Sequence, residues 1–280
     1  MLILKILSIG DNAADCYKDK NIFFPGGSAV NTIISCKRNG IEDCGYLGVF
    51  GNDFAAEHIE YVLKKEGIHI ERCRKIYAKS AHPQIVLKEE GAFSFICSPR
   101  QTSQHLVKLK LIDEDIEYIK NFDIIHCGFF SNIEEALVNL KPLGKISFDF
   151  AFMTDFNYVE SVCPFIDYAF FSASHLNEKE QLLLIEKCHA LGVEIVGLTL
   201  GREGSLFSHE GKLYTQSIKP SKAIDTMGAG DGFIGCFLST YPKTRDMEAA
   251  LEKASEYAAK ICENHGAFGY PKEIYEGLLD

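Results

Sequence analysis

The sequence predicts a single α/β domain in which helices cover both faces of a mostly parallel central sheet. Short apolar runs alternate along the 280 residues with longer segments of helical periodicity, and this alternation is typical of βαβ units. Apolar residues make up 46% of the chain, which is enough for one large core. No linker or internal repeat is evident, so we expect residues 1–280 to form one domain.

The predicted strands are short apolar runs rich in β-branched and aromatic residues. The first, residues 3–9, runs directly into Gly10 and Asp11, which favours a buried strand over a signal sequence. Residues 222–224 resemble the end of a strand before a glycine-rich turn. The other predicted strands are residues 45–50, 124–127, 145–150, 168–171 and 194–200.

The predicted helices are longer segments whose apolar residues recur at helical spacing. One of them follows the glycine-rich turn near residue 230, and we expect another short helix at the C-terminus. The remaining predicted helices are residues 29–38, 54–66, 113–120, 133–140, 178–191 and 247–264.

One region interrupts the alternation of strands and helices. Residues 71–97 are rich in strand-forming residues, with Pro83 and Gly91 as turn residues. A hairpin inserted into an α/β sheet can form a small β lid over the edge where ligands bind, and residues 12–24 are expected to add to it. The alternative is an extension of the main sheet at one edge.

Charge and composition indicate a small soluble substrate. The net charge is −10 and the pI about 5.4, so the chain lacks the basic surface that nucleic acid or an anionic membrane requires. No apolar run reaches the length of about 18 residues that a membrane span needs. We therefore expect a cytoplasmic protein with neither nucleic acid nor membrane as a partner.

The ten cysteines contain no C-x-x-C pair and no short cysteine–histidine cluster. Several lie within apolar runs, among them Cys97 and Cys127. The pattern favours buried free thiols in a reducing compartment.

Residues 225–231 contain the motif that carries the chemistry. Gly228, Ala229 and Gly230 form a turn that opens an apolar helix, and Asp231 lies in its first turn. Such a turn directs backbone N–H groups and the positive end of the helix dipole at one point. An anion site beside a carboxylate that can act as a general base is what phosphoryl transfer to a hydroxyl requires.

The same motif allows two other interpretations. Ordinary helix capping also uses glycine and an acidic residue in the first turn. Residues 230–235 match the dinucleotide fingerprint G-x-G-x-x-G, but that fingerprint belongs in the first strand-to-helix turn of its domain. A nicotinamide cofactor is therefore not expected.

A second group near the N-terminus fits a sugar acceptor. Asp11 follows the first strand directly, where a carboxylate can accept hydrogen bonds from hydroxyls, or from its own turn. Gly26 and Gly27 let a ligand approach the backbone, and the Asn31 amide can both donate and accept. Ser28 also fits a helix cap.

A third group fits a nucleotide. Gly201 and Gly204 follow Thr199 at the end of a predicted strand and leave room for phosphates and ribose, although a tight strand connection explains them equally well. Asn177 and Glu180 have the spacing of a helix cap, and they also suit a hydrated Mg²⁺ ion held through water.

The order of these motifs makes the sequence similar to the ribokinase/PfkB family of carbohydrate kinases from end to end. The resemblance is carried by Gly26-Gly27 with Asn31, by residues 225–231, by Asn177-x-x-Glu180 and by Thr199-x-Gly201-x-x-Gly204, without a Walker A sequence. It implies a ribokinase-like fold, ATP with Mg²⁺, and a homodimer formed through the lid. It also implies the following roles: Asp231 as general base, Asn264 at the ATP site, Glu180 near Mg²⁺, and Asp225 with Thr226 at a monovalent-cation site suited to K⁺.

Weaker features resemble the subgroup of the family that phosphorylates the 6-hydroxyl of fructosamines such as fructoselysine. They are Asp11 followed by Asp15 and Tyr17, Asp149 between two phenylalanines, Met227 and His265. Glu89 and Glu90 would offer an acidic lip to a lysine moiety. The alternatives are another kinase of this fold (a ribokinase, fructokinase or nucleoside kinase) and a non-catalytic sugar sensor.

Overall fold

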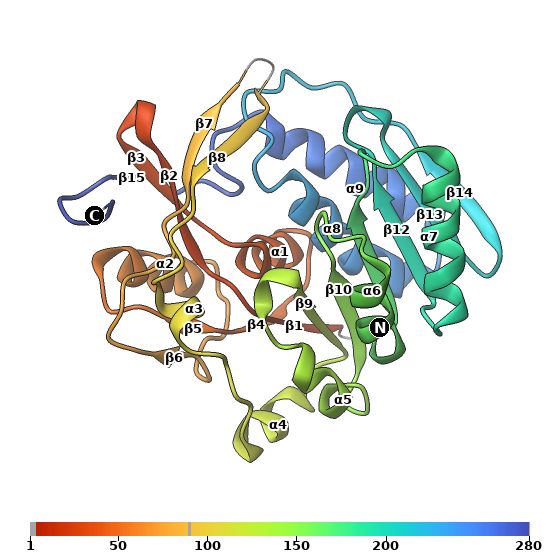
Figure 1. Ribbon diagram of the computed structural model, residues 1–280, viewed down its shortest axis with the longest axis horizontal. Coiled ribbons are helices and arrows are strands. Elements are labelled where there is room, and N and C mark those ends of the chain that lie inside the picture. Colours follow the sequence, from red (N-terminus) through yellow and green to blue (C-terminus); the bar gives the residue numbers. More distant parts are fainter. Residues whose placement is uncertain (1–3, 89–90, 280) are drawn as a thin grey trace.

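Two β-sheets organise the protein (Figure 1). The computed structural model describes residues 4–88 and 91–279. In this part the main sheet has eight strands in the order β14-β13-β12-β11-β10-β9-β1-β4, and neighbouring strands are parallel except for the antiparallel pairs β12–β13 and β13–β14. Their bounds are β1 (Lys5–Ile9), β4 (Asp43–Leu47), β9 (Ile124–Gly128), β10 (Lys145–Asp149), β11 (Tyr168–Ser172), β12 (Ile195–Thr199), β13 (Ser205–His209) and β14 (Lys212–Gln216).

Neighbouring residues of each central strand pack into two different cores. In β1, Ile6 belongs to one core and Leu7 to the other, and in β11 Phe170 and Phe171 divide in the same way. The first core includes residues of α1 (Ser28–Arg38), α2 (Phe54–Lys65), α8 (Ala229–Thr244) and α9 (Met247–Cys262). The second includes residues of α4 (Asp113–Ile119), α5 (Leu137–Leu140), α6 (Phe156–Val162) and α7 (Glu178–Ala190).

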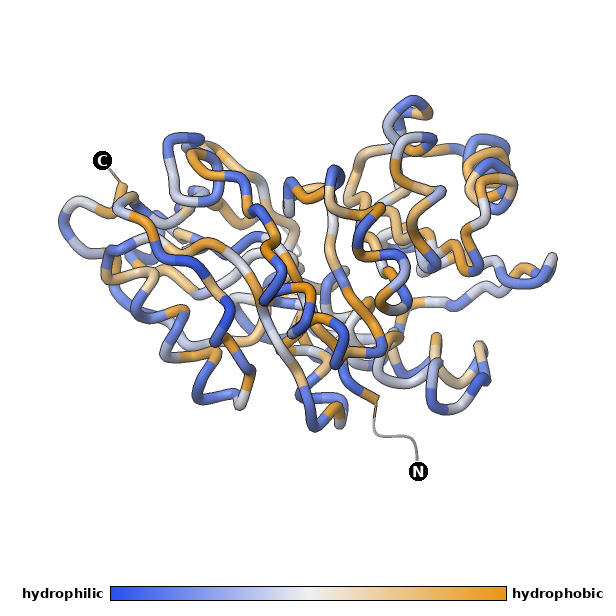
Figure 2. Tube along the Cα trace, turned by 90° about the horizontal axis from the view of Figure 1, so that it is seen from below, coloured by the Kyte–Doolittle hydropathy of each residue, from blue (hydrophilic) through white to orange (hydrophobic). Residues whose placement is uncertain are grey.

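Helices therefore cover both faces of the main sheet, which confirms the predicted fold class. Figure 2 shows that the peripheral helical coils alternate between hydrophobic and hydrophilic colours, as helices with one buried face do. No helix in residues 4–88 and 91–279 is long and apolar enough to cross a membrane.

The smaller sheet has the order β15-β3-β2-β7-β8. Its strands are β2 (Ala13–Tyr17), β3 (Ile22–Gly26), β7 (Gln84–Leu87), β8 (Phe93–Cys97) and β15 (Lys272–Glu273). The predicted hairpin is β7–β8, and it joins residues 13–26 rather than extending the main sheet. The start of the 71–97 region lies elsewhere, because β6 (Arg74–Lys75) pairs with β5 (Val49–Phe50).

Several element predictions were wrong. Residues 222–224 form no strand, since the Ile224 N–H donates to the Cys262 carbonyl instead of to a sheet. The predicted C-terminal helix is replaced by β15 and turns, where Gly266, Gly269 and Gly277 take positive φ. The elements that were not predicted include α6, β13, β14 and the short helix α3 (Ser103–Leu106).

Two predicted elements are divided. The predicted strand 45–50 becomes β4 and β5 because the chain breaks at Gly48, and the predicted helix 133–140 begins with the 3₁₀ turn Glu134–Ala136. All ten cysteines are free, and most are buried as expected. Cys97 is the exception, because the outer edge strand β8 exposes it.

Helices α1 and α8 approach closely at Gly235. A Cβ atom on Gly235 would lie 2.6 Å from the Ser35 Cβ and 2.7 Å from the Thr32 carbonyl oxygen, both on α1. Real Cβ atoms do not come this close, so any larger residue would separate the helices. This contact matters for function because the N-terminal turns of α1 and α8 carry Asn31 and Asp231.

We predict that Gly235→Ala lowers the free energy of unfolding by about 1–2 kcal/mol. Overpacking of about 1–3 kcal/mol outweighs the helix propensity that alanine gains, about 1 kcal/mol. Gly232→Ala is the control on the same helix, because its methyl meets only the movable Cδ1 of Ile261, at 2.0 Å. Urea unfolding measures both, and equal stability of the two variants would contradict the packing argument.

Candidate active site

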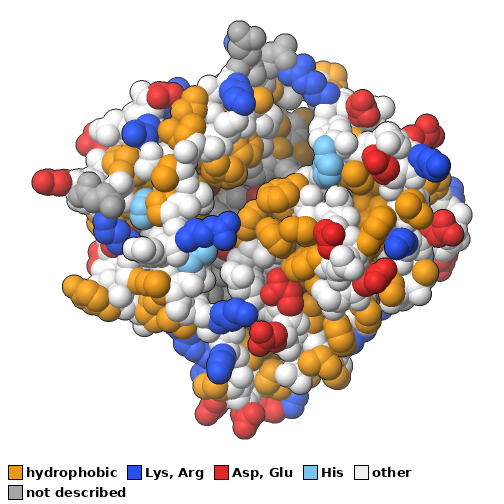
Figure 3. All heavy atoms as spheres, viewed as in Figure 1, with side chains coloured by type: hydrophobic (Ala, Val, Ile, Leu, Met, Phe, Trp, Pro, Cys, Tyr) orange, Lys and Arg blue, Asp and Glu red, His pale blue; other side chains and the backbone are white. Residues whose placement is uncertain are grey.

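The parallel strands bring several predicted site residues to one edge of the main sheet. Strands β1, β9, β10, β11 and β12 run in the same direction, so their carboxyl ends lie side by side. Asp11 follows β1, Asp149 ends β10 and Thr199 ends β12. Figure 3 shows a hollow near the centre of the face seen in Figure 1.

Asp11 connects the end of β1 to the start of α1. Its two carboxylate oxygens accept from the Ser28 N–H at 2.7 Å and the Ala29 N–H at 3.2 Å. Gly27 precedes the helix with φ 101°, and a Cβ there would lie 2.7 Å from the Asn12 Cα. Burial raises the pKa of Asp11, while the two N–H groups oppose the rise.

The glycine-rich motif forms the start of α8. Gly228 is the N-cap with φ 73°, and a Cβ there would lie 2.2 Å from that of Ala267, so only glycine fits. A Cβ on Gly230 would meet nothing within 4 Å, so the turn is open on that side. The N–H groups of the first helical turn have no intrahelical acceptors, which leaves them available to an anion.

Asp231 links the glycine-rich turn of α8 to the N-terminal residues that were predicted for the acceptor. One of its oxygens accepts from the Ser28 hydroxyl at 2.8 Å, and the other accepts from the Asn31 amide at 2.7 Å. The Asn31 Oδ1 atom is buried and has no partner among the described residues, so it is free to accept from a ligand hydroxyl. From the sequence, Asn31 and Asp231 were predicted as site residues, whereas Ser28 was predicted only as a helix cap.

A second carboxylate, Asp149, lies beside this group. The Ser28 hydroxyl is 2.8 Å from Asp231 and 3.4 Å from Asp149. Burial raises the pKa of Asp231 to about 7, and the charge of Asp149 adds to the rise. Burial likewise raises the pKa of Asp149 to about 6. A carboxyl with a pKa near neutrality is suited to general-base chemistry.

Asp15 was not predicted as a site residue. It lies on β2, is 5% exposed, and has no hydrogen-bond partner among the described residues. A Cβ on Gly26 would lie 2.1 Å from the Asp15 Oδ2 atom, so the glycine makes room for this carboxyl. Burial, followed by the charges of Asp231, Asp11 and Asp225, raises the pKa of Asp15 to about 8. The available signal was an aspartate in the middle of an otherwise uncharged strand.

Asp225 is fully buried and holds the loop before α8 in place. Its oxygens accept from the Tyr17 hydroxyl at 2.6 Å and from the N–H groups of Met227 and Gly266, both at 3.0 Å. Thr226 donates from its N–H to the Gly91 carbonyl at 2.9 Å, which ties the loop to the β7–β8 hairpin. The two residues predicted for a monovalent cation therefore already have structural contacts.

Five carboxyls thus lie around the region between the start of α8 and the start of α1. They are Asp11, Asp15, Asp149, Asp225 and Asp231. Among the described residues, none of them forms an ion pair with lysine or arginine. The basic side chain near this group in the described part of the chain is His265, whose Nδ1 lies 3.8 Å from the Asp225 carboxyl. Uncompensated negative charge of this kind favours the binding of a cation.

The predicted nucleotide residues lie at the ends of β11 and β12. The Thr199 hydroxyl donates to the Phe171 carbonyl at 3.3 Å, and Gly201 lies near Ser174 of the neighbouring strand end. Gly201 and Gly204 both take positive φ around a 3₁₀ turn. Asn264 follows α9 and contacts only that helix, through its N–H to Ile261 and its amide to Lys260.

Asn177 and Glu180 form a capping box at the start of α7. The Asn177 Oδ1 accepts from the Glu180 N–H at 3.1 Å, and the Glu180 carboxylate accepts from the Asn177 N–H at 2.9 Å. In residues 4–88 and 91–279, no three His, Cys, Asp or Glu side chains are grouped to hold a metal. A hydrated Mg²⁺ needs few protein ligands, so the two residues fit such an ion only through water. Glu89 and Glu90 lie outside the described residues.

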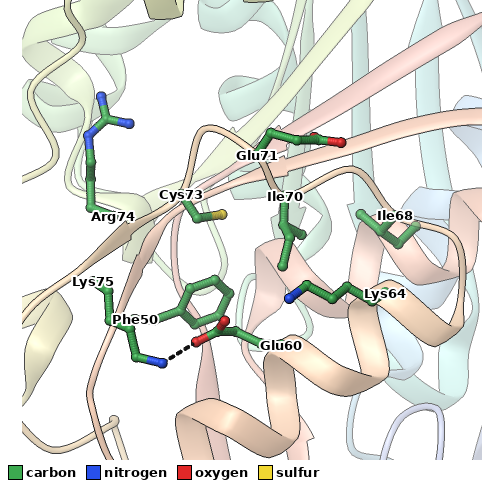
Figure 4. Close-up of a pocket in the computed structure, with 9 residues that line it drawn as sticks. All are labelled: Phe50, Glu60, Lys64, Ile68, Ile70, Glu71, Cys73, Arg74 and Lys75. Carbon is green, nitrogen blue, oxygen red and sulfur yellow. Dashed lines mark hydrogen bonds and ion pairs between the residues drawn. The ribbon is translucent and has the colours of Figure 1, made fainter.

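A hollow away from these residues is shown in Figure 4. It has a volume of about 380 Å³ and lies between α2 and residues 68–75, with a Lys75–Glu60 ion pair of 2.8 Å at its side. It contains none of the predicted site residues. A smaller hollow does, since Gly10 and Asp11 line it.

Fold and site together define an enzyme that transfers a phosphoryl group to a hydroxyl. The model of the pfkB family of carbohydrate kinases matches residues 11–273, and the chain belongs to this family. It is thus a sugar kinase, and kinases of this family use ATP. The resemblance found in the sequence is confirmed.

Two curated relatives cover almost the whole chain. Fructosamine kinase FrlD of Bacillus subtilis is 37% identical over 98% of this chain and 97% of its own. Fructoselysine 6-kinase of Escherichia coli is 30% identical over 94% of this chain and 99% of its own. Among solved structures, a ribokinase of Arabidopsis thaliana complexed with ribose and ATP has a TM-score of 0.78 at 20% identity, covering 95% of this chain and 94% of that chain. This likeness shows the fold.

We predict that Asp15→Asn stabilises the ligand-free protein more at pH 8.5 than at pH 5. The folded Asp15 carboxyl holds its proton up to about pH 8, whereas the unfolded one releases it near its ordinary pKa. Stability therefore falls as pH rises between these two values, and removal of the carboxyl removes that fall.

The measurement is the Tm of the variant and the parent at both pH values, where we expect a gain of several degrees at pH 8.5. Asp19→Asn, on the exposed turn after β2, is the control for the loss of one carboxyl. An equal Tm change for Asp15→Asn at pH 5 and pH 8.5 would show that this carboxyl does not titrate as described.

Proposed function

We propose that this kinase transfers the γ-phosphoryl group of ATP to the 6-hydroxyl of a fructosamine such as fructoselysine, with Asp231 as the general base. The observation that supports it most is the position of Asp231. It belongs to the anion turn of α8, yet both of its oxygens bond to α1, through Ser28 and Asn31. A group held in this way is within reach of both a phosphoryl group and an acceptor hydroxyl.

Asp231 would take the proton of the acceptor hydroxyl as the oxygen attacks. With a pKa of about 7 the carboxyl is partly ionised at neutral pH, so it can accept a proton and later release it. Ser28 and Asn31 orient the two oxygens and limit how far the pKa rises. Asp149, through the shared Ser28 hydroxyl, keeps the region negative and the base strong.

The start of α8 would stabilise the charge on the transferred group. ATP supplies that group, and Mg²⁺ neutralises its phosphate charge when bound. The turn of Gly228, Ala229 and Gly230 is open beside Gly230, where a Cβ would meet nothing within 4 Å, which fits the approach of a phosphoryl group to its N–H groups. Asn177, Thr199, Gly201, Gly204 and Asn264 are the proposed ATP residues, with Glu180 near Mg²⁺.

The acceptor would lie between Asp11, Asn31, Gly26 and Gly27. The unpartnered Asn31 Oδ1 can accept a hydrogen bond from a sugar hydroxyl. Glycine at positions 26 and 27 lets the chain pack closely against the Asp15 carboxyl and the Asn12 backbone. Asp15, whose side chain has no hydrogen-bond partner among the described residues, adds a buried carboxyl beside Gly26.

The charge of the site supports a substrate that carries an amine. Five carboxyls lie here without a lysine or arginine partner among the described residues, and a cation bound beside them would favour their ionised forms and lower their raised pKa values. The secondary amine of a fructosamine is protonated at neutral pH and would supply such a cation. The two relatives named for fructosamine and fructoselysine kinases point to the same substrate class. Asp225 and Thr226 remain the proposed position for K⁺.

The smaller sheet would act as the lid that excludes water. Met227 packs against Tyr17, Phe24 and Ile85 of this sheet, and Thr226 bonds to Gly91 of its hairpin. The sheet thus touches the motif beside the base, where water would otherwise compete with the sugar hydroxyl.

Substrate profiling tests the proposed acceptor. A coupled ADP-release assay compares fructoselysine with fructose, ribose and adenosine, and with no acceptor as the control for ATP hydrolysis. We expect kcat/KM for fructoselysine to exceed that for the free sugars at least about 100-fold, because only the adduct carries the cation that the carboxyls attract. Preference for fructose, ribose or adenosine would replace the proposed substrate.

We predict that Asp231→Asn lowers kcat by about 10²–10⁴-fold, because an amide cannot take the hydroxyl proton. Asp246→Asn is the matched control, since Asp246 also lies at a helix start but caps α9. Steady-state kinetics measure both. Turnover near the parent level in Asp231→Asn would eliminate this residue as the base.

A further inference from the structure

An aromatic surface lies beside the acceptor site and takes no part in the proposed chemistry. Phe129 and Phe130 follow β9, and Phe152 follows β10. Their ring centroids are 5.3 Å apart for Phe129–Phe130, 5.9 Å for Phe129–Phe152 and 6.2 Å for Phe130–Phe152. We call these three rings the aromatic surface.

The aromatic surface combines a supported centre with an exposed edge. Phe129 packs against Tyr158 at 5.5 Å, and the Tyr158 hydroxyl donates to Glu134 at 2.6 Å. In contrast, Phe130 is 43% and Phe152 60% exposed. Exposed aromatic residues that cluster on a supported base are typical of ligand contacts. Figure 3 shows hydrophobic side chains gathered beside the central hollow.

Two observations place the aromatic surface next to the acceptor residues. Gly128 and Asp149 are register partners on β9 and β10, so Phe130 and Phe152 follow directly from the strand ends that carry the site. Phe130 also lines the small hollow that Gly10 and Asp11 line. The aromatic surface therefore lies next to the carboxyls of the acceptor site.

We propose that the aromatic surface binds the apolar part of the amine substituent of the substrate and selects adducts over free sugar. This inference rests on the proposed function. A fructosamine presents its 6-hydroxyl at one end of the sugar and its amine on C1 at the other. With the 6-hydroxyl at Asp231, the substituent leaves the carboxyls and meets apolar rings, which suit the methylenes of a lysine or alkyl arm.

The experiment measures kcat and KM for fructose adducts of methylamine, butylamine and hexylamine. In the parent enzyme we expect kcat/KM to rise about two- to fourfold per methylene, which corresponds to partial to full burial. In Phe130→Ala/Phe152→Ala the rise is largely lost. KM for the hexylamine adduct increases about 30-fold or more, because five methylenes at about twofold each contribute that factor, whereas kcat and the KM for the methylamine adduct stay unchanged.

Two controls separate recognition from folding. Phe54→Ala removes a ring that is 46% exposed on α2 and contacts Tyr275, and it leaves the chain-length dependence intact. Phe130→Tyr/Phe152→Tyr keeps both rings and retains the dependence. A Tm equal to that of the parent confirms that each variant is folded.

Three outcomes would overturn the inference. An equal increase in KM for the methylamine and hexylamine adducts would mean that the rings stack on the sugar. Unchanged kinetics in the double alanine variant would show that the rings touch no substrate, although the proposed function would stand. Absence of turnover of every adduct by the parent enzyme would remove the proposed function and this inference with it.

Discussion

The hydrogen bonds from Ser28 and Asn31 to Asp231 are the constraint on which the site depends. They join residues about 200 positions apart, between α1, at the proposed acceptor site, and α8, whose start is the proposed anion site. The bonds form only because α1 and α8 approach closely at Gly235. In this sugar kinase of the pfkB family, the packing of two helices against one face of the sheet thus positions Asp231, the proposed base.

The same packing concentrates negative charge. Asp11, Asp15, Asp149 and Asp231 are brought together from different elements, and burial raises the pKa of each of them. Such a site is less stable without a cation than with one, because like charges repel in a poorly solvated space. Substrate binding would relieve part of this strain when the acceptor carries an amine, so the charge serves recognition as well as catalysis.

Local patterns in the sequence were sufficient for the fold and for the residues of the glycine-rich turns. Alternation of strands and helices fixed the parallel sheet, and this in turn placed Asp11 and Thr199 at one edge. Asp15 and Ser28 needed tertiary information, since their roles depend on the β2–β3 pairing and on the contact between α1 and α8. Residues 222–224 were wrongly predicted to end a strand. They hydrogen-bond to the end of α9, which lies far away in the sequence, and local patterns do not reveal such a contact.

The pH dependence of kcat/KM tests the central claim, that Asp231 is a base tuned by its carboxylate neighbours. The account predicts that kcat/KM falls below about pH 7, where Asp231 binds a proton. Asp149→Asn should move this inflection to lower pH, because the neighbouring charge that raises the pKa of Asp231 is removed. An acid inflection that stays in place in Asp149→Asn, or a parent profile that is flat between about pH 5 and 8, would contradict it.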